Sequence, residues 1–117
     1  MRTVHGGVVL TPELGACRGA TLRVRLLDVT LADAPATELG EVVVPAVDYD
    51  ATTERIVPFE VGAPDWEPGT SVIVSAHLDR SGDGDVVVGD ALTTQHYEVS
   101  DLGEGDRLLV RLTHVGP

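Results

Sequence analysis

Short stretches of alternating apolar and polar residues recur along this chain, separated by residues that favour turns. In the clearest stretch, Leu22, Val24 and Leu26 alternate with arginines, which is the two-residue period of a strand with one buried face. No long segment repeats its apolar residues at helical spacing. The pattern predicts seven strands, at residues 3–10, 21–28, 39–47, 55–61, 71–78, 91–99 and 107–114.

Three other predicted strands also divide into an inner and an outer row. The expected inner rows are Val57, Phe59 and Val61 in the strand 55–61; Val72, Val74, Ala76 and Leu78 in the strand 71–78; and Leu108, Val110 and Leu112 in the strand 107–114. In the strand 71–78, the outer row is expected to be Ser71, Ile73, Ser75 and His77. Pro45 and Pro58 cannot donate to a ladder, so their strands are expected at sheet edges or at bulges. The interpretation is a single all-β domain, 1–117, folded as a seven-stranded antiparallel β-sandwich, with a small open barrel as the alternative.

The charge of the chain excludes some classes of partner. The chain has nineteen acidic residues, eight arginines and no lysine, which gives a net charge of -11. Such a field repels phosphate backbones and anionic membrane surfaces, so nucleic acid and acidic lipid are not expected as partners, whereas cations are attracted. No segment has the length of apolar sequence that a membrane span needs.

Cys17 is the only cysteine, so no disulfide within the chain is expected. The segment from Leu14 to Cys17 resembles the end of a bacterial lipoprotein signal, in which the cysteine carries lipid. The preceding residues lack the continuous apolar segment of such a signal, because His5, Pro12 and Glu13 interrupt it. No export signal is therefore predicted.

The segment 79–90, Asp-Arg-Ser-Gly-Asp-Gly-Asp-Val-Val-Val-Gly-Asp, has the spacing of a twelve-residue calcium loop. Side-chain oxygens stand at places one, three, five and twelve, the place-seven residue would offer its carbonyl, and Gly84 at place six permits the sharp turn. The predicted Ca²⁺ ligands are Asp79, Ser81, Asp83, Asp85 and Asp90. The loop resembles those of EF-hands and of dockerin modules, although its flanks are predicted as strands. The alternative is an ordinary polar turn between two strands. If a cation binds, a structural role is favoured over a regulatory one.

Other candidate chemistry is sparse. His77 and His96 flank the loop, and a transition-metal site there would need a third ligand such as His5 or His114. Trp66 could contact a sugar or a peptide, but packing over the end of the sandwich is favoured. No nucleophile elbow, phosphate-binding glycine loop or zinc-binding helix motif is present, so no enzyme activity is predicted.

The run Ala-Thr-Leu-Arg-Val-Arg-Leu-Leu-Asp-Val-Thr-Leu-Ala-Asp-Ala-Pro-Ala, at 20–36, resembles a signature of the YbaY and YscW lipoprotein family, with Thr30 in place of serine. The segments 56–61 and 71–78 resemble two further strands of that family. The resemblance implies a β-sandwich in the bacterial periplasm or cell envelope, and for some members a pilotin or chaperone role in assembling the outer ring of a type III secretion system.

Together these observations predict a non-enzymatic module that binds a protein partner or supports an envelope assembly, with Ca²⁺ holding the loop 79–90. The alternative is a calcium-dependent module that binds a carbohydrate or small ligand through Trp66.

Overall fold

The computed structural model describes residues 2–31, 33–95, 97–100 and 106–116, and it folds them into nine strands and one short 3-10 helix. The elements are β1 (Arg2–Leu10), η1 (Pro12–Leu14), β2 (Cys17–Asp28), β3 (Thr37–Tyr49), β4 (Arg55–Ala63), β5 (Val72–Asp79), β6 (Ala91–Leu92), β7 (Tyr97–Glu98), β8 (Arg107–Arg111) and β9 (Thr113–His114). Among the described residues, no helix has the length and the apolar character that crossing a membrane requires.

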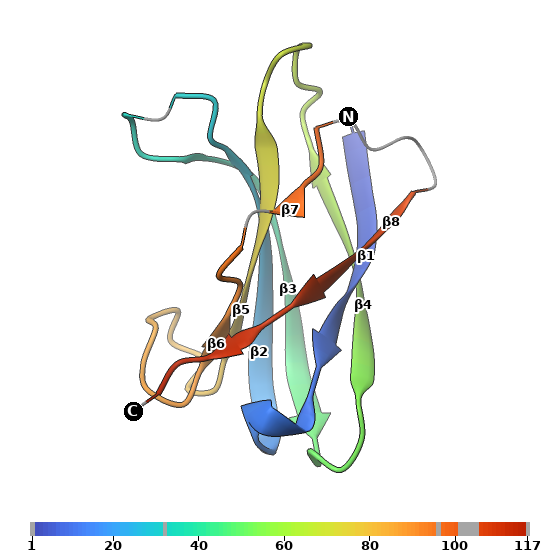
Figure 1. The fold of residues 1–117 in the computed structure, drawn as a ribbon, viewed down its shortest axis with the longest axis vertical. Coiled ribbons are helices and arrows are strands. Elements are labelled where there is room, and N and C mark those ends of the chain that lie inside the picture. The colour runs from blue at the N-terminus through green and yellow to red at the C-terminus, as the bar shows by residue number, and fades with distance from the viewer. Residues whose placement is uncertain (1, 32, 96, 101–105, 117) are drawn as a thin grey trace.

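Two sheets form the predicted sandwich (Figure 1). The smaller sheet has the order β4-β1-β8, and the larger has the order β3-β2-β5-β6-β9, with β7 paired to β5. The expected inner rows face each other between the sheets, and Leu22, Val24, Leu26 and Val110 are fully buried. The sandwich is therefore confirmed, and the sheets do not close into a barrel.

The two prolines lie at the edges that the sequence predicted for them. Pro58 is in β4 and Pro45 is in β3, which are edge strands of the two sheets. The register between β2 and β3 slips next to Pro45, where Ala46 takes a positive φ of 56°, so this edge also carries a bulge. Proline and a bulge both protect an edge strand from pairing with another chain.

The predicted strand 91–99 is not one continuous strand. It is divided into β6 and β7, and each of these pairs only two of its residues with β5. Its sequence alternates less regularly than that of β2, and just beyond Leu92 the Ala76 N–H of β5 donates to the side-chain hydroxyl of Thr93 at 3.2 Å, which is not a ladder bond. The chain therefore leaves the ladder between β6 and β7 instead of continuing along it.

The predicted last strand, 107–114, is divided between the two sheets, and the prediction of wholly antiparallel pairing is wrong here. β8 pairs with β1 in parallel, whereas β9 pairs with β6 antiparallel in the other sheet. In Figure 1 these two red strands run diagonally from one sheet to the other. Because β8 is reached by a connection between sheets and not by a hairpin, parallel pairing is open to it. Buried Leu112 lies at the crossing.

Two glycines permit close approaches that a side chain would prevent. A Cβ on Gly6 would collide with the backbone oxygen of Leu108, which fixes how closely β1 and β8 pair. A Cβ on Gly40 would collide with the backbone oxygen of Gly62, where β3 of one sheet approaches β4 of the other. The side of the sandwich formed by β3 and β4 is thus closed by direct backbone contact.

Trp66 packs against the core and is half-buried, as the sequence analysis favoured. The guanidinium carbon of Arg2 lies 4.3 Å from the centre of a Trp66 ring, within the range of a cation–π interaction. Part of the indole surface is therefore occupied by the protein itself.

Candidate functional site

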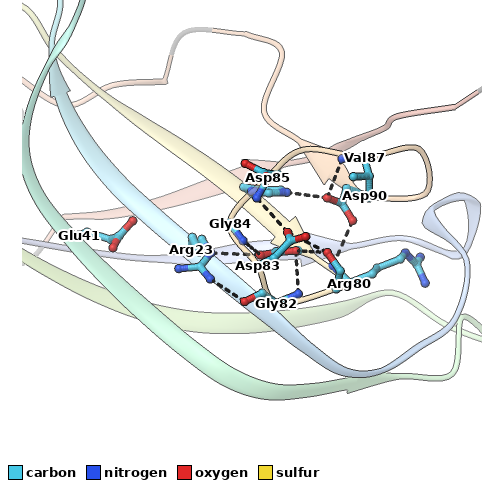
Figure 2. A network of polar contacts seen from close by, with 12 residues as sticks. Arg23, Glu41, Arg80, Gly82, Asp83, Gly84, Asp85, Val87 and Asp90 are labelled. Carbon is cyan, nitrogen blue, oxygen red and sulfur yellow. Dashed lines mark hydrogen bonds and ion pairs between the residues drawn. The ribbon is translucent and has the colours of Figure 1, made fainter.

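The loop 79–90 joins β5 to β6 and lies against the outer face of the larger sheet. Arg23 of β2 pairs with His77 of β5 in the ladder, and both side chains point to that face. The Arg23 guanidinium donates to Gly82 O at 3.3 Å and to Asp79 Oδ2 at 3.3 Å, so it ties the loop to the sheet (Figure 2). His77, expected on an exposed row, is only 8% exposed because the loop covers it.

Asp79 is fully buried at the start of the loop, and both of its carboxylate oxygens accept hydrogen bonds. Oδ1 accepts from the Gly82 N–H at 2.9 Å and from Ser81 Oγ at 3.2 Å, and Oδ2 accepts from the Gly84 N–H at 2.7 Å. Burial works to raise the pKa of Asp79, but the Gly84 and Gly82 N–H groups and Arg23 outweigh it and hold the pKa below its usual value. Asp79 is therefore an ionised anchor for the turn.

Asp90 is fully buried at the other end of the loop. Its Oδ1 accepts from the Arg80 N–H at 3.0 Å, and its Oδ2 accepts from the Val87 N–H at 3.2 Å and lies 2.8 Å from His77 Nε2. Burial works to raise its pKa, but the His77 bond and the two backbone donors lower the pKa overall. The carboxylate thus organises both ends of the loop from within.

Ser81 and Asp83 continue from Asp79 as a chain of oxygens. Ser81 Oγ lies 3.2 Å from Asp79 Oδ1 and 2.9 Å from Asp83 Oδ1. Neighbouring oxygens around a cation at about 2.4 Å lie roughly 2.8 to 3.4 Å apart, so these three side chains are spaced as calcium ligands would be. The same oxygens already accept hydrogen bonds from the loop, which a bound cation would have to replace in part.

Asp85 is exposed, and its N–H donates to Asp83 Oδ1 at 3.0 Å. Gly84 takes a φ of 89°, which glycine adopts without strain at this turn. The described geometry therefore gathers Asp79, Ser81 and Asp83 along one side of the loop, whereas the Asp90 carboxylate contacts His77 and backbone donors.

His77 forms a second grouping that the calcium-loop pattern did not include. Ligand atoms of His77, Asp79 and Asp90 all lie within 4.8 Å of one another, and all three residues are buried. The period-two pattern placed His77 beside this loop, but it could not show that the ring contacts Asp90. His5 lies on the outer face of the opposite sheet, where its Nδ1 is 3.9 Å from Glu60 Oε2. His96 lies outside the described residues. His5 therefore cannot complete a site with His77.

Arg80 and the end of the loop connect this site to the rest of the domain. The Arg80 guanidinium donates to the carbonyls of Leu14 and Ala16, in the segment between β1 and β2. At the other end, the Val115 N–H donates to Asp90 O at 2.8 Å and the Gly89 N–H donates to Val115 O at 2.7 Å. The loop thus holds together three segments that are distant in sequence.

Cys17, which the sequence placed at the end of a lipoprotein-like segment, lies in β2 and is 8% exposed. Its Sγ lies 3.6 Å from Val47 O, and burial raises the pKa of the thiol. In this fold Cys17 packs as a small core residue with an unreactive, protonated thiol.

No protein-family model matches the chain, and no curated protein matches it in sequence. Among solved structures, the chain is similar to an alternative pilotin from the type II secretion system of Vibrio cholerae. The two share a TM-score of 0.68 and 22% sequence identity over 99% of this chain and 98% of the pilotin. The similarity shows a common β fold over essentially the whole domain. The resemblance to the YbaY and YscW family, and the calcium site, stay predictions.

Proposed function

We propose that this chain is a non-enzymatic, pilotin-like module that binds a protein partner during assembly of an envelope complex. The observation that carries the proposal is the fold shared with the Vibrio cholerae pilotin along nearly the full length of both chains. The segments that resemble the YbaY and YscW family point to the same class of role. A module of this kind works through its surface and requires no reacting centre.

A structural Ca²⁺ in the loop is a separate part of the proposal. The oxygens of Asp79, Ser81 and Asp83 have suitable spacing, and the net charge of -11 attracts divalent cations. The cation would reinforce a loop that Arg23 and Asp90 already order, and it would stabilise the domain without contacting the partner.

The proposed role is tested in the source organism. We expect that deletion of the gene lowers the amount of the assembled outer-membrane ring of a secretion system, and that expression of the chain restores it. The readout is the ring multimer in fractionated envelopes, detected after mild detergent extraction. If the multimer is unchanged in amount and location after deletion, the pilotin-like role is wrong.

A further inference from the structure

The edge strand β8 differs from the other long edge strands of the sandwich. β3 and β4 each carry a proline, β3 also carries a bulge, and the two approach each other at Gly40 and Gly62. β8 pairs with β1 on one side, has no proline and no bulge, and forms the opposite edge of the smaller sheet. Within the described residues, β8 thus lacks the proline and the bulge that protect the edges at β3 and β4.

The backbone groups at this open edge can be identified. Leu108 O points toward β1, because it would collide with a Cβ on Gly6. Arg111 points the other way, since its N–H donates to Tyr97 Oη at 2.9 Å and its carbonyl accepts from the same hydroxyl at 3.4 Å. Successive residues of a strand alternate in direction, so the N–H and C=O of Arg107 and Leu109 also face away from β1. In the described part of the chain, Tyr97 bonds to this edge at its Arg111 end, and no bond to the backbone of Arg107 or Leu109 on this side is seen.

The side chains beside this edge combine apolar surface with positive charge. Leu109 is 55% exposed and Ile56 is 50% exposed, and both lie over Gly7 on the outer face of the smaller sheet. Arg107 and Arg111 stand on either side of Leu109 on the same face. Arg107 has no acidic partner within the described part of the chain, and Arg111 has only exposed Glu54 at 4.0 Å. Two cations here are notable on a chain with a net charge of -11.

We propose that the open edge of β8 binds an extended segment of the partner protein by adding a strand to the smaller sheet. The segment carries an apolar residue between two acidic residues at alternate positions. Its backbone pairs with Arg107 and Leu109, its apolar side chain extends the Leu109 surface, and its acidic side chains lie opposite Arg107 and Arg111.

A second copy of this chain does not fit the same edge. Antiparallel pairing of two β8 strands about Leu109 would place Arg107 of one copy opposite Arg111 of the other, and like charges directly opposite destabilise a ladder. Acidic residues in the occupant remove that repulsion and gain from both arginines. The charge pattern therefore selects a different, acidic chain.

This inference rests on the proposed function, because the segment belongs to the partner. The probe is a fluorescein-labelled peptide of the order Ser-Glu-Thr-Leu-Thr-Glu-Ser, titrated with the full chain and followed by fluorescence anisotropy. We expect binding that weakens about tenfold or more in the Arg107→Glu, Arg111→Glu double variant, as two cross-strand pairs become repulsive. A peptide with lysines in place of both glutamates should bind the double variant and not the original chain.

Two controls separate edge pairing from general charge attraction. A peptide N-methylated at the residues that pair with β8 should lose binding, and the Arg18→Glu variant, which changes an exposed arginine of the other sheet, should bind like the original chain. No binding, binding unchanged in the double variant, or binding unaffected by N-methylation overturns the inference. If the peptide fails while the double variant restores the envelope ring in the deletion strain, only the edge inference is wrong. If deletion has no effect while the peptide binds, only the pilotin-like role is wrong.

Discussion

Removal of the Asp90 carboxylate tests whether the loop 79–90 is ordered from within. In Asp90→Ala, the Arg80 N–H, the Val87 N–H and buried His77 lose their acceptor. A buried donor without a partner costs about 1 to 3 kcal/mol. Val87 is 42% exposed, so water can replace part of its bond, whereas His77 is covered. We therefore expect a loss of about 3 to 5 kcal/mol of unfolding free energy.

The matched control is Asp83→Ala. Asp83 also accepts two hydrogen bonds within the loop, from Ser81 and Asp85, but all three residues are exposed. Water can replace both bonds, so we expect a loss below about 1 kcal/mol.

The assay is urea unfolding at pH 7 with a chelator present, followed by circular dichroism and fitted with a shared denaturant slope. The chelator removes any contribution from a bound cation, so the difference between the two variants reports the hydrogen bonds alone. A loss below about 1 kcal/mol in Asp90→Ala, or equal losses in the two variants, would refute the assignment of Asp90 as the buried anchor of the loop.

Three further measurements test other parts of the structure. Millimolar Ca²⁺ should raise the midpoint of thermal unfolding relative to chelator, by the equivalent of about 2.7 kcal/mol when Ca²⁺ is at a hundredfold excess over the dissociation constant. The Asp79→Ala, Asp83→Ala double variant should show no rise. An unchanged midpoint in the original chain rules the calcium site out. The pKa values of Asp79 and Asp90 are lowered in the folded state, so the stability that their ionised forms contribute is present above the unfolded pKa of about 3.9 and is lost as the pH falls through the lowered values. In chelator, unfolding free energy should therefore fall more steeply with acid in the original chain than in Asp90→Ala, and equal slopes would contradict this. Gly6→Ala should cost about 3 kcal/mol in urea unfolding, because its Cβ meets both the backbone oxygen of Leu108 and the buried ring of Phe59. A neutral effect would show that β1 and β8 pair less closely.

The sequence predicted the inner rows of three long strands well because burial alone decides these rows. In β2, β4 and β5 every expected inner residue is buried, since each strand faces the opposite sheet along its whole length. The edge positions of β3 and β4 were also predictable, because a proline removes a ladder donor wherever it stands. These are local properties that a short stretch of sequence carries by itself.

The C-terminal part was not predictable in the same way. The residues of β8 and β9 alternate as one strand would, yet the chain changes sheets near Leu112. Alternation fixes which side chains are inside a sandwich, but it does not fix which of the two sheets a strand joins or in which direction it pairs. Those choices depend on Gly6, which admits β8 closely beside β1, and on Tyr97, whose hydroxyl binds both backbone groups of Arg111 at the crossing.

The candidate site shows the same limit. Ligand spacing selected Asp79, Ser81 and Asp83, which do lie together, but it treated Asp90 only as a twelfth ligand. Its contacts with His77 and Arg80 depend on how the loop folds back over the larger sheet. A buried acidic residue that accepts several backbone hydrogen bonds has the same sequence signature as a metal ligand, since both need a carboxylate beside glycines in a tight turn.

Backbone hydrogen bonds join the loop 79–90 to the segment that follows β9, and through β9 to the proposed binding edge of β8. The loop can therefore help to position β8 even when no cation is bound. Asp90 and Gly89 pair through their backbones with Val115, just after β9, and β9 continues directly from β8. β6 and β9 share only two residue pairs, so these added bonds hold the end of the crossing strand in the larger sheet. With that end fixed, and with Tyr97 bonded to the backbone of Arg111, β8 keeps its pairing with β1, and the backbone groups of Arg107 and Leu109 face away from β1. Loosening the loop should therefore weaken peptide binding at an edge to which none of its residues belongs.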